Sequence, residues 1–354
     1  MRPFFYALTI LLFSKTTHAQ ELNFDAVDKY FAIAEDLKQG KPLTDQSWNE
    51  LLAYPGIQLY IKNNGLDENS LKSYRRNFEI AYMPNNDSLL NVRLKEPEKY
   101  FVLWVFNNYK IQENELKSYY QKIKSNESNY LDSIYANSYK MLPKRMQKKA
   151  TNTTIYFIPL MNDAVAEDEN IVLTLYGAYH FDKLKYGALG GHEIHHILRK
   201  NKRTDNNGDK YLFEALTLLL NEGSADLIDK KYTASEECPM DLRYYEYLME
   251  YGPNALALLD TAILAHIDKT QQISENDLPN IAPMSGHIPG CYMATVIERN
   301  GFEKELITSV DDPVKFILLY NKAAKMDEEK PYLFSGKVIS YVKKMKQKKS
   351  LQHL

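Results

Sequence analysis

A cluster of three histidines within five positions restricts the fold of this chain more than any other feature. Residues 187–200 read GALGGHEIHHILRK, in which His192, Glu193 and His196 form the pattern H-E-x-x-H. On a helix, residues four positions apart share one face with their Cβ atoms about 5–6 Å apart. Both imidazoles can then bind one ion at the Zn–N distance of about 2.0–2.1 Å. Glu193 lies beside that ion, where it can accept a proton from water. The pattern therefore predicts a helix that carries a metal site.

Two other interpretations of the cluster stay open. From the composition, chance produces about 0.01 matches to this pattern in a chain of this length, so coincidence is a poor explanation. The cluster could still be a solvated helix face that binds no metal. A frame that uses His192 and His195 also lies on one helix face, but it gives Glu193 no role. In the H-E-x-x-H frame, His195 is typical of a packing or outer-shell histidine.

A catalytic zinc site usually has three protein ligands and one open position for water, so a third ligand is needed. The metzincin continuation requires glycine at 199 and histidine at 202, where this chain has Arg199 and Lys202. Glu222, in NEGSADLID, follows the turn-rich segment NKRTDNNGDK and is our predicted third ligand. A helix here places it on one stripe with Ala215, Leu218, Leu219 and Asp226.

Asp226 lies one helical turn beyond Glu222. Its carboxylate could accept the outer N–H of His192, a contact that metal-binding histidines almost always make. Gly223 costs about 1 kcal/mol of helix stability relative to alanine, which is understandable if the two helices approach closely at the metal. A surface carboxylate is the alternative for Glu222, but an acidic residue two positions after LTLLL in an apolar helix is expected to have a partner.

The first 19 residues predict export. The segment MRPFFYALTILLFSKTTHA combines an early arginine, an apolar run from Phe4 to Phe13, and small or polar residues before Ala19. This order is typical of a secretory signal peptide. The run is too short to span a bilayer, and no later run is long enough. We therefore expect a periplasmic or extracellular protein without a transmembrane span.

Charge and cysteine content restrict the partners further. Removal of the predicted leader also removes Arg2 and Lys15, which changes the net charge from −2 to −4. No overall basic field therefore points to nucleic acid. Cys238 and Cys291 could form one disulfide in an exported protein or remain as buried thiols, and the sequence leaves both possibilities open.

Hydrophobic periodicity predicts helices on both sides of a short β region. Apolar residues recur at helical spacing over residues 24–37 and 96–149, and Thr44 could cap another helix. TTIYFIPL and NIVLTLYGAYHF, separated by the polar NDAVAEDE, are typical of two strands. Helical spacing returns from Tyr211. We expect a mainly α fold with a small antiparallel β-sheet (α+β), and a change in organisation near residue 150.

The ligand pattern H-E-x-x-H followed by E-x-x-x-D resembles that of the gluzincin zinc metallopeptidases. The resemblance covers about residues 187–229, and the flanking text, including the later GHIPGCYMATVIERNG, is similar to exported bacterial zinc-dependent peptidases. It implies a zincin-like core at 151–354, preceded by a signal peptide at 1–19 and a helical region at 20–150, with a peptide or protein as substrate. The residues that carry it are His192, Glu193, His196, Glu222 and Asp226.

Both the residues and the resemblance predict metal-assisted hydrolysis with one zinc ion per chain. Zinc lowers the pKa of its water to about 7. Glu193 would be the general base that takes the proton and later returns it to the leaving amine. The alternative is a non-catalytic exported protein with a structural zinc. Structural sites usually have four ligands rich in cysteine, whereas Cys238 and Cys291 lack C-x-x-C partners.

A zinc hydrolase also needs a donor for the oxyanion that develops during attack. In GHIPGCYMATVIERNG, Gly286, Pro289 and Gly290 constrain the start of a helix, and His287 and Tyr292 are the candidate donors. We favour Tyr292, because a phenol donates at neutral pH while His287 needs the right tautomer or a proton. Ordinary packing is the alternative for both side chains.

Overall fold

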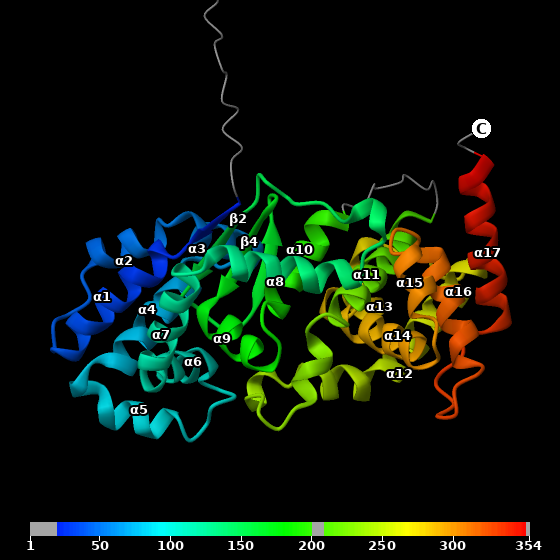
Figure 1. Ribbon diagram of the computed structural model, residues 1–354. Coiled ribbons are helices and arrows are strands. Elements are labelled where there is room, and N and C mark those ends of the chain that lie inside the picture. The colour runs from blue at the N-terminus through cyan, green and yellow to red at the C-terminus, as the bar shows by residue number, and fades with distance from the viewer. Residues whose placement is uncertain (1–19, 200–208, 352–354) are drawn as a thin grey trace, which may run out of the picture.

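The computed structural model describes residues 20–199 and 209–351. The predicted signal peptide therefore lies outside the described residues. Helices make up most of the described chain, and they surround one four-stranded sheet (Figure 1). The sheet has the order β1-β2-β4-β3, and its strands are β1 (Glu21–Asn23), β2 (Thr154–Ile158), β3 (Ala164–Glu167) and β4 (Asn170–Thr174).

The sheet is mixed, so the prediction of an antiparallel sheet is wrong. β1, β2 and β4 run parallel to one another, and only β3 is antiparallel to its neighbour β4. The polar segment that was expected to join two strands contains β3 itself. The chain therefore reverses twice between β2 and β4, which makes these two strands parallel. The second predicted strand also ends early, because Thr174 accepts a hydrogen bond from the Gly177 N–H at 3.3 Å and caps a helix.

The N-terminal helices up to residue 124 lie at one end of the molecule, coloured blue to teal in Figure 1, and the helix that follows runs across its middle. The predicted cap is confirmed, because the Thr44 hydroxyl accepts a hydrogen bond from the Ser47 N–H at 3.1 Å. The helices are α1 (Asp25–Lys38), α2 (Asp45–Leu52), α3 (Pro55–Asn63), α4 (Glu68–Tyr82), α5 (Asp87–Arg93), α6 (Phe101–Ile111), α7 (Glu113–Lys124) and α8 (Glu127–Lys140).

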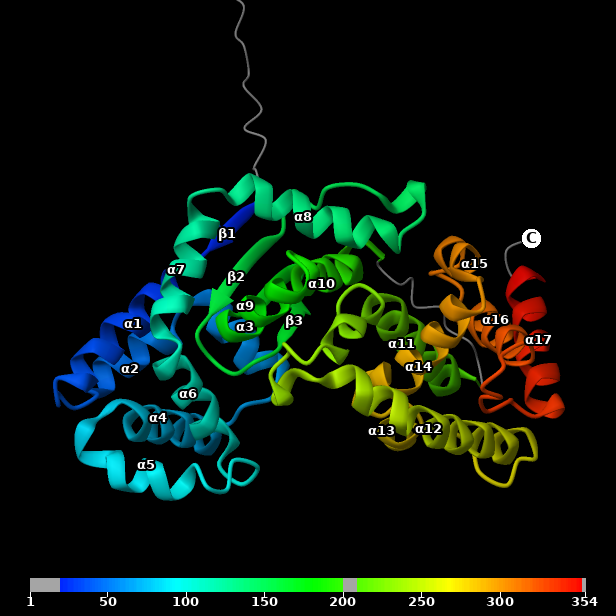
Figure 2. The same ribbon diagram turned by 60° about the horizontal axis from the view of Figure 1, so that its bottom comes forward.

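After β4, the chain forms α9 (Leu175–Leu184) and α10 (Ala188–Arg199), the helix with the histidine cluster. α10 contacts β3, β4 and α8, and Figure 2 shows it between the sheet and α8. A Cβ atom on Gly190 would lie 2.6 Å from Cδ1 of Ile134 in α8. The glycines before the cluster therefore let α8 pack closely on α10 and hold it against the sheet.

The remaining helices form the other end of the molecule, with α14 at their centre. α14 contacts α11, α12 and α16, and it crosses α11 where Gly223 meets Gly290. A Cβ atom on Gly223 would lie 2.3 Å from the Gly290 carbonyl oxygen. Gly223 thus permits close approach to α14, whereas we had expected close approach to the histidine helix.

These helices are α11 (Lys210–Asp226), α12 (Tyr244–Ile267), α13 (Leu278–Ile281), α14 (His287–Arg299), α15 (Glu303–Thr308), α16 (Pro313–Ala324) and α17 (Gly336–Leu351). Short 3₁₀ turns complete the secondary structure: η1 (Pro84–Asn86), η2 (Lys144–Met146), η3 (Lys230–Ala234), η4 (Met240–Leu242), η5 (Glu275–Asp277) and η6 (Met284–Gly286).

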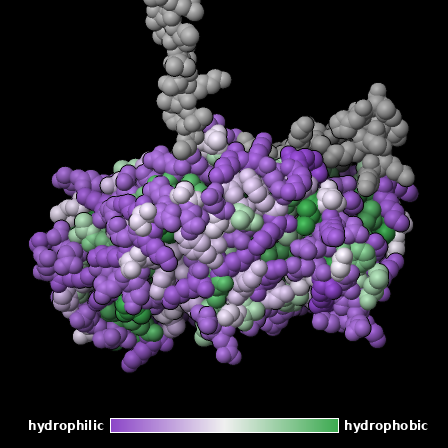
Figure 3. Space-filling view, viewed as in Figure 1, coloured by the Kyte–Doolittle hydropathy of each residue, from purple (hydrophilic) through white to green (hydrophobic). Residues whose placement is uncertain are grey.

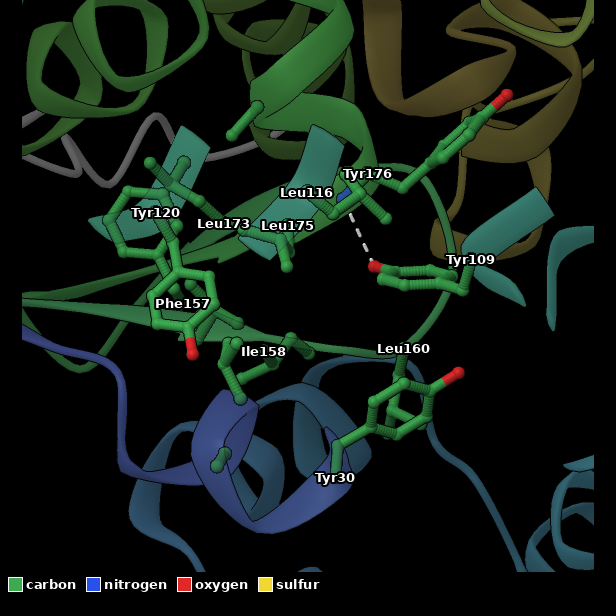
Figure 4. Close-up of a cluster of buried hydrophobic side chains, with 14 of the residues drawn as sticks. Tyr30, Tyr109, Leu116, Tyr120, Phe157, Ile158, Leu160, Leu173, Leu175 and Tyr176 are labelled. Carbon is green, nitrogen blue, oxygen red and sulfur yellow. Dashed lines mark hydrogen bonds between the residues drawn. The ribbon is translucent and has the colours of Figure 1, made fainter. Parts of the chain in front are cut away.

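Buried apolar side chains form two large clusters. The first core runs from Leu22 to Leu198, together with Cys238, Leu242 and Val310, and it includes the sheet. Figure 4 shows its centre, where the Tyr109 hydroxyl accepts a hydrogen bond from the Tyr176 N–H at 3.1 Å. The second core runs from Leu212 to Met345, together with Met141. The buried side chains of α10 therefore belong to the first core, and those of α11 belong to the second.

None of the helices within the described residues is both long enough and apolar enough to cross a membrane. The face in Figure 3 is mostly hydrophilic, with separate apolar patches.

Candidate metal centre

The two cores meet at the ligand-type side chains that the sequence singled out. α10 places the imidazole rings of His192 and His196 with their centroids 4.8 Å apart. Oε2 of Glu222, on α11, lies 3.5 Å from Nε2 of His192 and 3.3 Å from Nε2 of His196. The structure thus brings together the three predicted ligands from two helices.

These separations suit a zinc ion. Two ligand atoms at tetrahedral positions, each about 2.0–2.1 Å from zinc, are about 3.3 Å apart. One ligand atom from each of His192, His196 and Glu222 lies within 4.8 Å of the other two. Two neutral nitrogens and one carboxylate oxygen are also ligands that zinc accepts. The residues present therefore fit the predicted ion, and they leave one coordination position free.

Asp229 holds the other nitrogen of His192. Its Oδ1 is 2.9 Å from Nδ1 of His192, whereas Oδ1 of Asp226 is 3.8 Å from the same nitrogen. Asp229, rather than the predicted Asp226, therefore makes the hydrogen bond to this nitrogen, and Asp226 lies farther from it. Asp229 follows the end of α11, so the helical spacing that pointed to Asp226 could not place it. With Nδ1–H bonded to Asp229, the Nε2 lone pair of His192 is directed toward Glu222.

Lys230 holds the carboxylate of Asp229 in place through two hydrogen bonds. Its Nζ donates to Oδ2 of Asp229 at 2.7 Å, and its backbone N–H donates to Oδ1 at 2.7 Å. Burial alone would raise the pKa of Asp229, but His192 and Lys230 lower it well below the usual range. Asp229 is therefore ionised at neutral pH. Sequence reasoning missed both residues, and their only signal is the acid-base pair directly after the helix with Glu222.

Asp226 orients a different histidine, His287, the first residue of α14. Nδ1 of His287 is 2.9 Å and 3.1 Å from the two carboxylate oxygens of Asp226. Nε2 of His287 then lies 3.4 Å from Oε2 of Glu222. Gly286 makes this position possible, because it has a φ of 101° and a Cβ atom there would lie 2.6 Å from the carbonyl carbon of Leu218. His287 is thus at the site, as the sequence suggested.

Tyr292, the favoured oxyanion donor, is not brought to the histidines. It follows His287 by five residues, which is roughly 140° further around the helix. Its ring belongs to the second core and packs against α12, where a Cβ atom on Gly252 would lie 2.4 Å from Cβ of Tyr292. Burial raises the pKa of Tyr292. The packing alternative therefore describes Tyr292 better than the catalytic one.

Glu193 and His195 are the remaining candidate residues on the histidine helix. Glu193 is 5% exposed and close enough to Asp163 to contribute to that carboxyl's raised pKa of about 6, of which burial is the main cause. His195 is fully buried, and burial lowers its pKa well below the usual value. His195 belongs to neither group of ligand-type side chains found among the described residues. The geometry thus favours the frame that uses His192 and His196.

A second group, His192, Asp226 and Asp229, also has its ligand atoms within 4.8 Å of one another. Each of its carboxylates already binds a neighbour, since Asp229 is bonded to Lys230 and Asp226 to His287. This group therefore supports the first one rather than forming a competing site. Cys238 and Cys291 are both buried free thiols, so the possible disulfide is absent and neither sulfur is among these ligands.

Comparison with known proteins gives one family. The family model described as "Putative zinc dependent peptidase (DUF5700)" matches residues 48–329, which is most of the chain and includes every residue of the site described above. Neither the curated proteins nor the solved structures contain a match.

Proposed function

The chain belongs to this family of zinc-dependent peptidases, and from that premise we propose that it hydrolyses peptide bonds with one zinc ion held by His192, His196 and Glu222. The observation that carries this proposal is the position of Oε2 of Glu222. It lies 3.3–3.5 Å from the Nε2 atoms of both histidines of the H-E-x-x-H pattern. We assign the arrangement to the gluzincin type and the surrounding fold to the zincin type.

Zinc bound here would polarise the scissile carbonyl and lower the pKa of a water molecule to about 7. Glu193 is the residue next to His192 on the same helix, so it can accept that proton and later donate it to the leaving amine. Its low exposure keeps bulk water from competing for the proton. Glu193 is therefore our general base.

His287 is our donor for the developing oxyanion. Asp226 accepts from Nδ1, so Nε2 can donate only when the ring is protonated, and the Asp226 carboxylate stabilises that protonated form. Nε2 of His287 faces the same oxygen of Glu222 as the other two histidines. A substrate oxygen at the open coordination position would thus lie within reach of this ring. Tyr292 has no part in this step.

The substrate class follows from the edge of the sheet next to α10. β3 is the last strand of the sheet and lies next to α10 (Figure 2). Its four residues are only partly buried. The outer N–H and C=O groups of an edge strand can pair with an extended peptide. We propose that β3 binds the substrate backbone in this way. We also propose that residues 1–19 direct export, which N-terminal sequencing of the mature protein would test.

A closed structural site is the second candidate, because Nε2 of His287 is 3.4 Å from Oε2 of Glu222 and could supply a fourth ligand. The positions of His192 and His196 relative to His287 disfavour this closed site. Four tetrahedral ligands would all be about 3.3 Å apart. In the described chain, the ligand atoms of His192, His196 and Glu222 all lie within 4.8 Å of one another, and His287 is not part of this group. The open three-ligand site is therefore the better description.

The test uses the mature wild-type protein, Glu193→Gln, and the control Glu246→Gln on the exposed surface of α12. Metal analysis should find one zinc per chain in all three. Hydrolysis of unfolded proteins and short peptides should fall by about 10²–10⁴-fold in Glu193→Gln alone. Full activity in Glu193→Gln would reject the general base. Zinc-loaded protein that cleaves none of these substrates would favour the non-catalytic zinc protein.

A further inference from the structure

We propose that Arg199 and Asn221 position Glu222 so that it presents only Oε2 to the metal. This inference rests on the proposed function in one respect, namely that Glu222 is a metal ligand. Among the described residues, Arg199 and Asn221 make no hydrogen bond to His192, His196 or His287, and the pair would act entirely through the second carboxylate oxygen.

The three side chains form a continuous hydrogen-bonded chain. Arg199, the last residue of α10, is 2% exposed and donates from Nη1 to Oδ1 of Asn221. Nδ2 of Asn221 donates to Oε1 of Glu222 at 2.9 Å. Arg199 also donates from Nε to the carbonyl oxygen of Val310, which belongs to the first core. The guanidinium is thus fixed by a backbone group as well as by Asn221.

Arg199 determines which way the Asn221 amide faces. A guanidinium has only donors, so the group that it contacts must be the carbonyl oxygen of the amide. The NH₂ group of Asn221 is then directed toward Glu222, where it can donate to Oε1. Without Arg199, either end of the amide could face Glu222, and a carbonyl oxygen there would repel the carboxylate. The arginine therefore acts on Glu222 through the orientation of Asn221.

The result separates the roles of the two carboxylate oxygens. Oε1 of Glu222 accepts from Asn221, while Oε2 lies 3.3–3.5 Å from Nε2 of His192, His196 and His287. A carboxylate held in this way binds a metal through one oxygen. A catalytic zinc site needs this, because a second oxygen on the ion would occupy the position reserved for water. Arg199 and Asn221 are thus positioning residues that keep the site open.

The same chain of bonds joins the two halves of the site. Arg199 ends the helix that carries both histidine ligands, and Asn221 precedes the carboxylate ligand on α11. Burial lowers the pKa of Arg199 to about 10, and attraction to Glu222 opposes this change, so the side chain remains charged at neutral pH. A charged arginine at this point sets the distance between α10 and α11 close to the ligands.

The experiment compares wild type with Asn221→Asp, which keeps the shape of the side chain but removes the donor to Glu222. Zinc Kd would be measured by competition with a chromogenic chelator. The visible spectrum of the cobalt-loaded protein would report the coordination number. We expect about 10–100-fold weaker zinc binding and a changed cobalt spectrum at full occupancy. Asn254→Asp, at an exposed position of α12, is the control for the added charge and should match wild type.

Two further variants separate the possible outcomes. Arg199→Lys keeps the charge but loses the planar set of donors, so it should weaken zinc binding and alter the cobalt spectrum in the same direction as Asn221→Asp. It also provides the measurement if Asn221→Asp does not fold. Unchanged Kd and spectrum in the folded variants would overturn the positioning role. If Glu222→Ala also leaves Kd unchanged, the proposed metal site itself fails. If only Glu222→Ala weakens binding, the positioning role alone fails.

Discussion

The first core and the second core are filled with different kinds of side chain. In the first, aromatic rings stack in a row, with ring centroids 4.6 Å apart for Tyr30 and Phe78 and 5.3 Å apart for Phe78 and Phe106. The second is mainly aliphatic, and its central helices cross at Gly223 and Gly290 without side chains between them. One core depends on large interlocking rings, and the other on close contact of helix backbones.

This difference matters because each core supplies part of the site. α10 carries the two histidine ligands and is held by the sheet and α8, while Glu222 and His287 come from α11 and α14. The ligands therefore converge only when both cores are packed and docked on each other. Zinc bound at the proposed site, across this boundary, should stabilise the docked arrangement by about 2.7 kcal/mol at 100 times its Kd.

The largest expected effect comes from an aromatic side chain of the first core. Phe78 is fully buried between Tyr30 and Phe106, so Phe78→Ala should lower the free energy of unfolding by about 3–5 kcal/mol. Leu219→Ala, at a fully buried position of the second core, should lower it by about 2–5 kcal/mol. Urea denaturation measures both. A loss below about 1 kcal/mol in either variant would show that the core concerned collapses around the cavity.

The next prediction concerns the glycine crossing of the second core. In Gly223→Ala, the new Cβ atom would meet the Gly290 carbonyl at 2.3 Å, and backbone cannot move aside as a side chain can. We expect a loss of about 1–3 kcal/mol in unfolding free energy, with weaker zinc binding because Glu222 is the adjacent residue. Gly336→Ala is the control, since nothing lies within 4 Å of its added Cβ atom. Equal stability of the two variants would contradict close packing of α11 and α14.

A third prediction compares the two carboxylates behind the site. Asp229 bonds His192, a proposed ligand, so Asp229→Asn should weaken zinc binding by about 10–100-fold. Asp226 bonds His287 instead, so Asp226→Asn should change zinc affinity less and turnover more. Chelator competition and steady-state kinetics on the same preparations measure the two effects. The opposite order would return Asp226 to the position beside the metal that its sequence spacing suggested.

The sequence predicted the centre of this site because helical spacing determines it. His192, Glu193 and His196 are fixed relative to one another by one helix, and the apolar stripe of α11 correctly directed Glu222 inward. Asp229 could not be found in this way, because it follows the end of α11 and its position depends on a turn. Tyr292 was favoured for the chemistry of its phenol, and periodicity gave no information on the rotation of its helix that could have excluded it from the site.

The fold was predictable to a similar degree. Local periodicity gave the helices and the region of the strands, but strand direction depends on connections that are not local. β1 pairs with β2 across more than a hundred intervening residues, and the short β3 lies in the polar segment that was expected only to separate two strands. The orientation of Asn221 is a further example, because it depends on an arginine of another helix.

The smallest effect that we predict is a pH dependence confined to the first core. Asp182 accepts hydrogen bonds from the Tyr119 hydroxyl at 2.7 Å and from the Gly187 N–H at 2.8 Å, yet burial raises its pKa to about 7 from the ordinary 3.8. The folded state thus retains a proton that the unfolded state has already released. Stability therefore falls as pH rises from about 4 to about 7. Asp163, whose raised pKa is about 6, contributes to the lower part of this range.

Asp182→Asn isolates the upper part, because its amide can accept from the Gly187 N–H and donate to Tyr119 without titrating. Between pH 6 and 7, wild type should lose about 1 kcal/mol of unfolding free energy more than Asp182→Asn does. Other groups that titrate in this window, including the histidines, contribute equally to both proteins and cancel in the difference. Urea denaturation at the two pH values measures it. Identical slopes in the two proteins would mean that Asp182 is already ionised at pH 6 and that the first core tolerates its charge.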